Sequence, residues 1–291
     1  LDNNFQNMLF DIKNLDCIYD RARFPVLKVE ELKIYGGELT FIIGPSGIGK
    51  STLLETLGMM NNTAEIKDPG FFHFYSSAKS NPIKILKFWS MKEKYLAELR
   101  KSYFSFIFQN NNLMQSFDAK ENILLTQLIQ GADYSKAKIV TDDILENLNL
   151  KEVVSNSKRV SDYSGGQKQR IAFARAIVTD FRILFGDEPT GNLDPNNANT
   201  LMDILKNKVS KTNKSAVIVS HDINLALKFA DRILVINGVV KKQDNEDDIV
   251  YGLIDKSSVF EKKNNNFWIH LDENLKSENL KSVLLSKMSI S

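Results

Sequence analysis

With 291 residues, 43% of them hydrophobic, the chain is long enough to build a core for one large domain or two ordinary ones. Lys and Arg number 38 against 36 Asp and Glu, and this net charge of +2 gives no reason to expect nucleic acid as the main partner. The single cysteine, Cys17, excludes an intrachain disulfide framework and is typical of a reducing compartment. No apolar run approaches the roughly 18–20 residues that span a bilayer, and residues 1–20 lack a signal-peptide pattern. We therefore expect a soluble, cytoplasmic chain.

Short strands alternate with longer helices along most of the chain. Residues 10–20 alternate between apolar and polar side chains, as a half-exposed antiparallel strand does. Nearly continuous apolar runs with β-branched or aromatic residues follow at 39–43, 104–108, 182–187, 216–220 and 232–236. Such runs between helices indicate a buried, mostly parallel sheet. The expected fold class is therefore α/β.

Three segments carry helical patterns or a change of character outside this alternation. Residues 83–102 form an amphipathic, lysine-rich helical stretch, and residues 118–160 hold no good strand, which predicts a helical subdomain inserted at about 110–165. After residue 240 a charged turn leads to a final amphipathic helix with Leu280, Leu284 and Met288 on one face. We expect a main domain over 1–242 and a C-terminal extension over 243–291.

The stretch GPSGIGKST, residues 44–52, fits the pattern G-x-x-x-x-G-K-[ST] between an apolar strand and a helix. Glycines at this place let the backbone wrap around a polyphosphate, and the helix N-terminus adds partial positive charge. Lys50 can reach the terminal phosphates, and the hydroxyl of Ser51 can complete the oxygen shell of a Mg²⁺ ion. The predicted phosphate-binding residues are Gly44, Ser46, Gly47, Gly49, Lys50, Ser51 and Thr52.

The strand in RILFGDEP delivers two adjacent acids to the same region. Asp187 can hold a Mg²⁺-bound water, and Glu188 is then placed to orient an attacking water. The alternative, in which the two acids only cap the next helix, is disfavoured by the presence of the phosphate-binding pattern.

A second anion-binding helix start lies in YSGGQKQR, residues 163–170, which is followed by apolar residues at helical spacing. With these three stretches the sequence resembles the nucleotide-binding subunit of an ABC transporter. GPSGIGKST resembles the first Walker motif of that family, ILFGDE the second, and YSGGQKQR the signature segment. Gln109 in FIFQ matches the family's Q-loop, Asp194 in NLD its D-loop, and His221 in VSHD its switch histidine. The resemblance covers roughly residues 8–242.

The resemblance implies a P-loop NTPase ABC cassette with a mixed sheet core, an antiparallel β subdomain and an inserted helical subdomain. It further implies that ATP and Mg²⁺ bind between two copies of the chain packed head to tail, so that each signature segment contacts the partner's nucleotide. Glu188, His221 and Gln109 would then be catalytic, and Ser51, Gln109 and Asp187 would hold Mg²⁺. The nucleotide would also meet the signature residues Ser164, Gly165, Gly166 and Gln167, together with Asp194 and, under the adenine, Tyr19.

Within the family, FGDEPTGNLD and the residues after His221 are most similar to the group serving lipoprotein release, macrolide and peptide export, and cell division. In that group closure of the ATPase dimer drives a membrane subunit, so we expect a subunit peripheral on the inner face of the cell membrane. The ATPase of a nutrient importer and a soluble ABC protein without a membrane partner are the alternatives. The segment 61–103 is longer than in the short members of the group, and the tail is extra.

Overall fold

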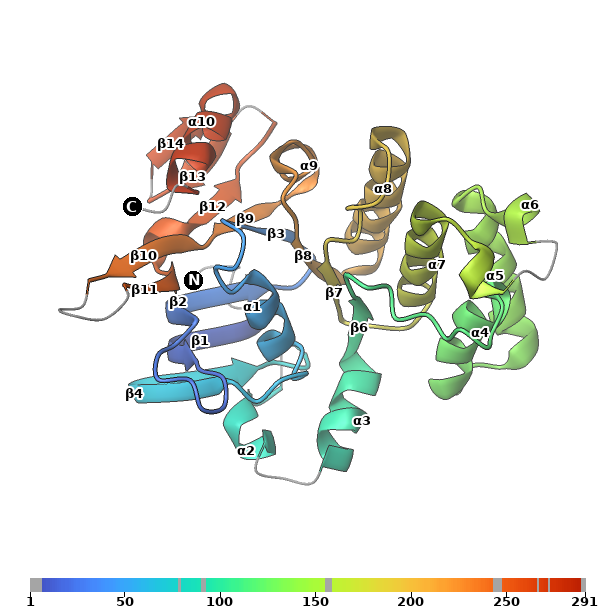
Figure 1. The fold of residues 1–291 in the computed structure, drawn as a ribbon, viewed down its shortest axis with the longest axis horizontal. Coiled ribbons are helices and arrows are strands. Elements are labelled where there is room, and N and C mark those ends of the chain that lie inside the picture. Colours follow the sequence, from blue (N-terminus) through green and yellow to red (C-terminus); the bar gives the residue numbers. More distant parts are fainter. Residues whose placement is uncertain are drawn as a thin grey trace.

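The computed structural model describes residues 7–77, 80–89, 93–154, 159–242, 248–265, 267–271 and 273–288. Its centre is an eight-stranded sheet in the order β14-β13-β12-β9-β3-β8-β7-β6 (Figure 1). Five of these strands match the apolar runs of the sequence and pair in parallel: β3 (Leu39–Ile43), β6 (Phe104–Ile107), β7 (Ile183–Asp187), β8 (Ser215–Val219) and β9 (Arg232–Val235). Because antiparallel strands extend the sheet beyond β9, the expected mixed sheet is confirmed.

A second, six-stranded sheet has the order β10-β11-β2-β1-β4-β5. The expected strand near the N-terminus is β1 (Met8–Cys17), which lies between β2 (Leu27–Tyr35) and β4 (Ala64–Phe74) and pairs antiparallel with both. The remaining strands are β5 (Ile83–Lys84), β10 (Asn237–Lys241) and β11 (Ile249–Ile254). This sheet is antiparallel except where β11 meets β2.

Helices cover both faces of the central sheet. Alternate residues of a strand point to opposite sides, and in the central strands both sides are buried. Phe41 and Ile43 lie in one hydrophobic cluster with α7 (Gly165–Ile177), α8 (Pro195–Thr212) and α9 (Ile223–Phe229). Ile42 lies in the other cluster with α1 (Lys50–Leu57) and the second sheet. The start of α1, where the phosphate-binding pattern lies, is therefore held between two packed layers.

The segment 119–154 contains helices only, namely α4 (Ala119–Ile129), α5 (Tyr134–Asn147) and the short α6 (Lys151–Val154). Asp118 and Glu121 form a capping box at the start of α4, and the side chain of Asp133 caps α5. A 3₁₀ turn, η2 (Val160–Asp162), leads from this part of the chain to α7. In Figure 1 these helices lie beside α7, at the side of the molecule away from β1 and β2.

The lysine-rich stretch at 83–102 differs from its sequence-based prediction at its start. Ile83 and Lys84 form β5, which pairs with the free edge of β4, so the helical part begins only with α2 (Ile85–Trp89). The next helix, α3 (Glu93–Tyr103), leads directly into β6.

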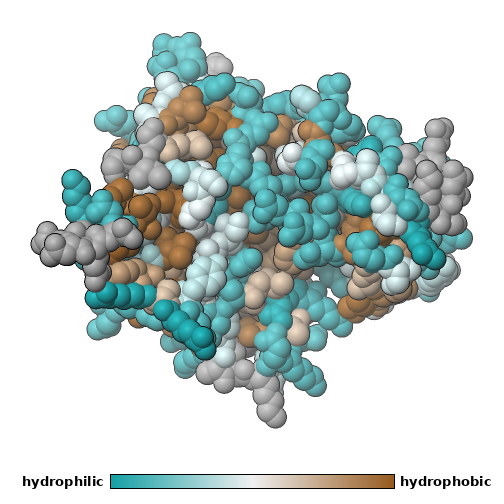
Figure 2. Space-filling model, viewed as in Figure 1, coloured by the Kyte–Doolittle hydropathy of each residue, from teal (hydrophilic) through white to brown (hydrophobic). Residues whose placement is uncertain are grey.

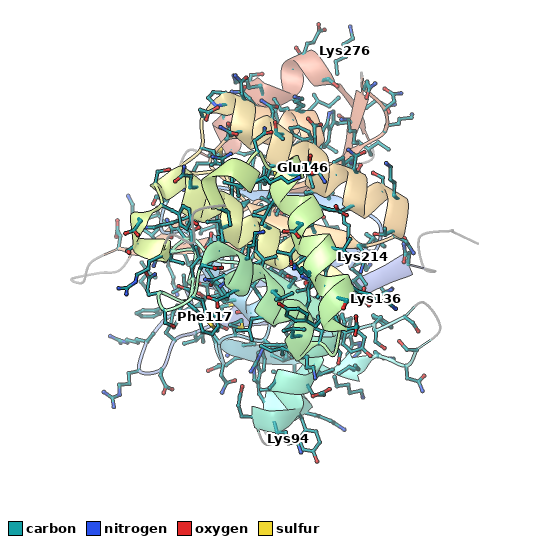
Figure 3. The ribbon with its side chains drawn as sticks, turned by 90° about the vertical axis from the view of Figure 1, so that its right-hand side faces the viewer. Lys94, Phe117, Lys136, Glu146, Lys214 and Lys276 are labelled. Atoms are coloured by element: carbon teal, nitrogen blue, oxygen red, sulfur yellow. The ribbon has the colours of Figure 1, made fainter. Side chains whose placement is uncertain are left out.

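Hydrophilic residues cover most of the face of the molecule that Figure 2 shows. Figure 3 places Lys94 of α3 and Lys276 near the C-terminus at opposite ends of the molecule.

The segment after residue 247 adds strands to both sheets, which the sequence did not predict. Strand β11 completes the second sheet, while β12 (Val259–Lys262), β13 (Phe267–His270) and β14 (Glu273–Lys276) extend the central sheet beyond β9. The short turn η3 (Lys256–Ser258) joins the two parts. The predicted final helix is α10 (Ser277–Lys287), and Leu280 and Leu284 are buried as expected. Most of the expected charged turn lies outside the described residues.

Candidate functional site: a phosphate cavity at the carboxyl ends of the central strands

The phosphate loop, residues 44–52, joins the end of β3 to the first turn of α1. Gly49 has a φ of 98° and its α-carbon faces the Leu27 side chain, so a side chain here would meet Leu27 Cβ at 3.2 Å. Glycine is therefore required at this position. The buried Lys50 turns back over the loop, and its Nζ donates to the carbonyl oxygens of Gly44 at 3.0 Å and Pro45 at 2.6 Å.

Asp187 is the last residue of β7, which β8 separates from β3, and Glu188 follows it, as the sequence predicts. Glu188 has a φ of 49°, in the left-handed region, and its N–H donates to the carbonyl of Val219 on β8 at 3.0 Å. This backbone conformation turns the Glu188 side chain out of the sheet and toward the phosphate loop. Such strain in a non-glycine residue persists only where the surrounding structure enforces it, and it is characteristic of functional sites.

His221 follows β8 and lies against the Glu188 carboxylate. Its backbone N–H donates to Oε2 at 3.4 Å, and its ring Nε2 lies 3.3 Å from Oε1 without the geometry of a hydrogen bond. Glu188 Oε1 is thus a buried oxygen with no hydrogen-bond partner. An acceptor in this state at the wall of a cavity is free to receive a hydrogen bond from a bound water or ligand.

Burial governs the protonation of this group of side chains. It raises the pKa of Glu188 to about 7, with the nearby Asp187 adding to the rise and the His221 N–H and Lys50 opposing it. Burial also lowers the pKa of His221, and the positive charge of Lys50 adds to that effect. Because both changes favour the neutral forms, the contact between Glu188 and His221 is not a fixed ion pair near neutral pH. A carboxyl whose pKa lies near 7 is suited to act as a general base.

These segments enclose a cavity of about 220 Å³. It brings together most of the predicted site residues, and Val219 joins them: the lining is Ser46, Gly47, Gly49, Lys50, Ser51, Thr52, Gln109, Asp187, Glu188, Val219 and His221. Tyr19 lies next to this lining, because its hydroxyl is 3.0 Å from the Thr52 hydroxyl, and its side chain is exposed.

The described residues contain no group of three or more His, Cys, Asp or Glu side chains that could hold a metal ion. Ser51, Gln109 and Asp187 bring oxygen-bearing side chains to the same cavity, and oxygen is the ligand atom that Mg²⁺ takes from proteins, usually from few residues together with substrate phosphates.

The signature segment, residues 163–170, lies elsewhere on the same chain and does not line this cavity. Ser164 is the N-cap of α7 and forms a capping box with Gln167: Gln167 N–H donates to Ser164 Oγ at 3.3 Å, and Ser164 N–H donates to Gln167 Oε1 at 2.9 Å. Gly165 has open space around its α-carbon, whereas a side chain on Gly166 would meet the carbonyl oxygen of Asn192 at 3.2 Å. This helix start is exposed and has room for a ligand beside it.

Asp194 is the N-cap of α8, and its carboxylate accepts hydrogen bonds from the first turn of that helix. Oδ1 accepts the N–H groups of Asn196 and Asn197 at 3.1 Å each, and Oδ2 accepts a hydrogen bond from the Asn197 side chain. The bond from the Asn197 side chain is the main cause that lowers the pKa of Asp194, and the backbone bonds add to it. Asp194 therefore shapes the end of the loop at 191–194, and the structure does not bring it into the phosphate cavity. The same helix-capping chemistry is used by Asp222 at the start of α9, directly after His221.

The sequence-based reasoning missed Gln169, a buried side chain that connects the signature helix to the acids. Its Nε2 donates to the carbonyl oxygen of Glu188 at 2.7 Å, and its Oε1 accepts the N–H of Asn192 at 2.8 Å. A signal was present, because Gln169 shares a helical stripe with Ala172, Phe173 and Ala176, all buried. A polar residue on such a stripe needs buried hydrogen-bond partners.

Comparison with known proteins agrees with this geometry. The family model described as "ABC transporter" matches residues 27–191. A lipoprotein-releasing system ATP-binding protein LolD from Pseudoalteromonas translucida is 34% identical over 224 residues, which are 76% of this chain and 90% of the relative. The protein of the same name from Bacteroides fragilis is 35% identical over 209 residues, 72% of this chain and 89% of the relative.

Among solved structures, the chain is similar to the ATP-binding cassette MJ0796, determined as a dimer in a post-hydrolysis state bound to ADP and Pi. The TM-score is 0.67 with 29% sequence identity, over 78% of this chain and 94% of the cassette. A likeness to cbiO1 from Clostridium perfringens, with a TM-score of 0.63 and 23% identity over 79% of this chain and 84% of that one, supports the fold alone.

Proposed function

The chain belongs to the ABC transporter family, and on this premise we propose that it is the ATP-hydrolysing subunit of a transporter, acting as a homodimer around two ATP molecules. One observation carries the proposal: residues from separate parts of the sequence meet at a single cavity beside the phosphate loop, while the signature segment lies outside it. The dimeric form of MJ0796 and its bound hydrolysis products support the same reading.

Within the cavity, the phosphate loop and Lys50 bind the β- and γ-phosphates through backbone N–H groups and the ammonium group. Ser51, Gln109 and Asp187 would hold Mg²⁺, which neutralises charge on the phosphate oxygens when it is bound with the nucleotide. Tyr19 stacks on the adenine from its exposed position beside Thr52.

Glu188 is the general base of the proposed mechanism. Its unpartnered Oε1 accepts a hydrogen bond from the attacking water. It takes the proton of that water as the water oxygen bonds to the γ-phosphorus in line and the bond between the γ-phosphorus and the ADP oxygen breaks. His221, 3.3 Å from that oxygen, holds the water and the γ-phosphate in register. With its pKa raised to about 7, Glu188 is about half ionised at neutral pH, and its ionised form is a stronger base than an ordinary carboxylate.

In the dimer the exposed start of α7 meets the partner's nucleotide. The residues that contact its γ-phosphate are those of the helix start, Ser164, Gly165, Gly166 and Gln167, where backbone N–H groups and the helix dipole favour an anion. Asp194 lies at the same interface and fixes the loop before α8. Each ATP therefore joins the two subunits, and its hydrolysis releases them.

The membrane partner determines what the hydrolysis does. Because the relatives are named for a lipoprotein-releasing system, we assign dimer closure to driving a membrane subunit in lipoprotein release, export or a related periplasmic process. The proposed place is peripheral, beside that membrane subunit on the inner face. Among the residues that the structure describes, none of the helices has the length and apolar character of a membrane span. A largely apolar groove of about 320 Å³ between β6, α4 and α7 fits a short helix of that subunit.

The test combines a measurement of the phosphate-release rate with purification of the ATP-bound complex from membranes. Glu188→Gln should lower phosphate release by roughly 10² or more while ATP still binds. Glu146→Gln, which changes an exposed carboxylate on α5, is the matched control and should keep the wild-type rate. A normal rate in Glu188→Gln would remove Glu188 from its role.

The same variant, purified from native membranes with ATP, should retain the closed dimer with its membrane subunit. A subunit with few spans and a large periplasmic domain would support the proposal. A permease with many spans and a binding protein would indicate an importer, and ribosomes or no partner would indicate a soluble ABC protein.

A further inference from the structure

Gln169 is a buried polar side chain in the middle of an apolar helix stripe, and both ends of its amide are used. It is 1% exposed, and its two hydrogen bonds run to residues on either side of the turn after β7: the carbonyl of Glu188 at 2.7 Å and the N–H of Asn192 at 2.8 Å. Because a buried amide that loses such partners destabilises the folded chain, its geometry is firmly fixed.

These bonds act on the residue with the strained backbone. The Glu188 N–H is held by Val219 at 3.0 Å, and its carbonyl is held by Gln169 and by the Gly191 N–H at 3.2 Å. With φ at 49°, small rotations of this peptide would swing the carboxylate relative to Lys50 and His221. The Gln169 amide therefore helps to define where Oε1 lies in the cavity.

The start of the same helix lies outside this cavity. Five residues before Gln169, the N-cap Ser164 begins α7 at the surface, and the Gly166 α-carbon packs against the carbonyl of Asn192. The first turn of α7, the loop at 191–194 and the Glu188 backbone are thus joined through Gln169 and this close packing. A shift of the helix start must move the Glu188 carbonyl or break a buried bond.

We propose that Gln169 is a positioning residue that couples the signature segment to Glu188, so that contact of the helix start with the partner's ATP sets the Glu188 carboxylate in its own cavity. The inference rests on the proposed function, because it requires two nucleotides between two subunits. Its consequence is that each ATP site reports its occupancy to the other, and hydrolysis is cooperative in ATP.

The experiment compares two buried glutamines. Gln169→Met keeps the length and helix preference of the side chain but removes both hydrogen bonds. Gln127→Met makes the same change in α4, where Gln127 is 5% exposed and its Nε2 donates to the Thr141 hydroxyl at 2.9 Å. Both variants lose buried hydrogen bonds, so the control matches the cost in stability.

The measurements are steady-state phosphate release against ATP concentration, equilibrium ATP binding, and ATP-induced dimerisation in a Glu188→Gln background.

In Gln169→Met we expect kcat to fall roughly tenfold to a hundredfold and the Hill coefficient to fall from the wild-type value to the lower value that ATP-dependent dimerisation alone gives. ATP affinity and ATP-induced dimerisation should stay within about twofold of wild type, because the phosphate loop is untouched. Gln127→Met should keep the wild-type Hill coefficient. An unchanged kcat and Hill coefficient in Gln169→Met, or an equal loss in the control, would overturn the inference, and so would loss of dimerisation.

A second variant keeps the test decisive if Gln169→Met does not fold. Gln169→Leu fills the same buried space with a strong helix former and has no polar atom to bond to the Glu188 carbonyl or the Asn192 N–H. The same loss of kcat and cooperativity supports the coupling, and wild-type behaviour would overturn it. A wild-type chain that releases no phosphate would contradict the proposed function, which separates that failure from a failure of the coupling.

Discussion

Replacing Glu188 by glutamine should stabilise the nucleotide-free protein at alkaline pH while it removes the base. The folded chain holds the Glu188 pKa at about 7, against an ordinary value of 4.5, and the main cause is burial. The difference of 2.5 units corresponds to about 3 kcal/mol of unfolding free energy, from 1.36 kcal/mol per unit. The side chain is 15% exposed, so solvent screens this free energy little.

The direction of the effect follows from proton binding. Below pH 4.5 the carboxyl is protonated in both states and gives no penalty. As the pH rises from 4.5 to about 7, the folded state keeps the proton that the unfolded state has released, so the free energy of unfolding falls through this window. Above pH 7 the full penalty is present. Glutamine carries no charge and escapes it at every pH.

Thermal unfolding without nucleotide at pH 8 and pH 4.5, followed by circular dichroism, measures the effect. The Tm of Glu188→Gln should exceed that of wild type by roughly 6–12 °C at pH 8, at about 2–4 °C per kcal/mol, and the two should approach each other at pH 4.5. Glu146→Gln, an exposed change on α5, should move the Tm little at either pH. Equal Tm values for Glu188→Gln and wild type at pH 8 would refute the claim that burial raises the Glu188 pKa.

Three further predictions address the nucleotide contacts. Lys50→Ala should abolish ATP binding in an equilibrium titration, because it removes the ammonium group over the phosphate loop, and retained micromolar affinity would contradict that role. Tyr19→Ala should weaken ATP binding by about 1–3 kcal/mol through lost stacking, whereas Tyr19→Phe keeps the ring and should bind nearly as wild type in the same titration. Gly252→Val should weaken ATP binding at least about tenfold, because a side chain on β11 would meet the carbonyl oxygen of Ile48 in the phosphate loop at 2.3 Å; wild-type affinity would show that β11 does not constrain that loop.

The prediction from sequence was strongest where a feature is local. Residues 44–52 need only a tight glycine turn between a strand and a helix, and the five apolar runs became the parallel strands because such runs must be buried on both faces. The amphipathic spacing in α10 likewise gave Leu280 and Leu284 as its buried face. The roles assigned to single site residues stay predictions.

Features that depend on partners distant in sequence were not predicted. Strand β4 contains Pro69 and Gly70, both unfavourable in a strand, and it forms because the β1 edge offers it backbone partners. Strand β11 is defined by its place between β10 and β2, and the close approach of the Ile48 carbonyl leaves room only for glycine at position 252. Short strands of this kind carry too weak a local pattern to be recognised alone.

The sequence by itself determined the phosphate loop, the positions along the chain of the five apolar strands, and the acids at the end of β7. Each of these features is specified by neighbouring residues. Only the tertiary structure decided that the tail joins both sheets and that Gln169 bonds to Glu188. The physical reason is that hydrogen bonds and close packing between distant segments depend on the three-dimensional path of the chain, and no pattern within a short window encodes that path.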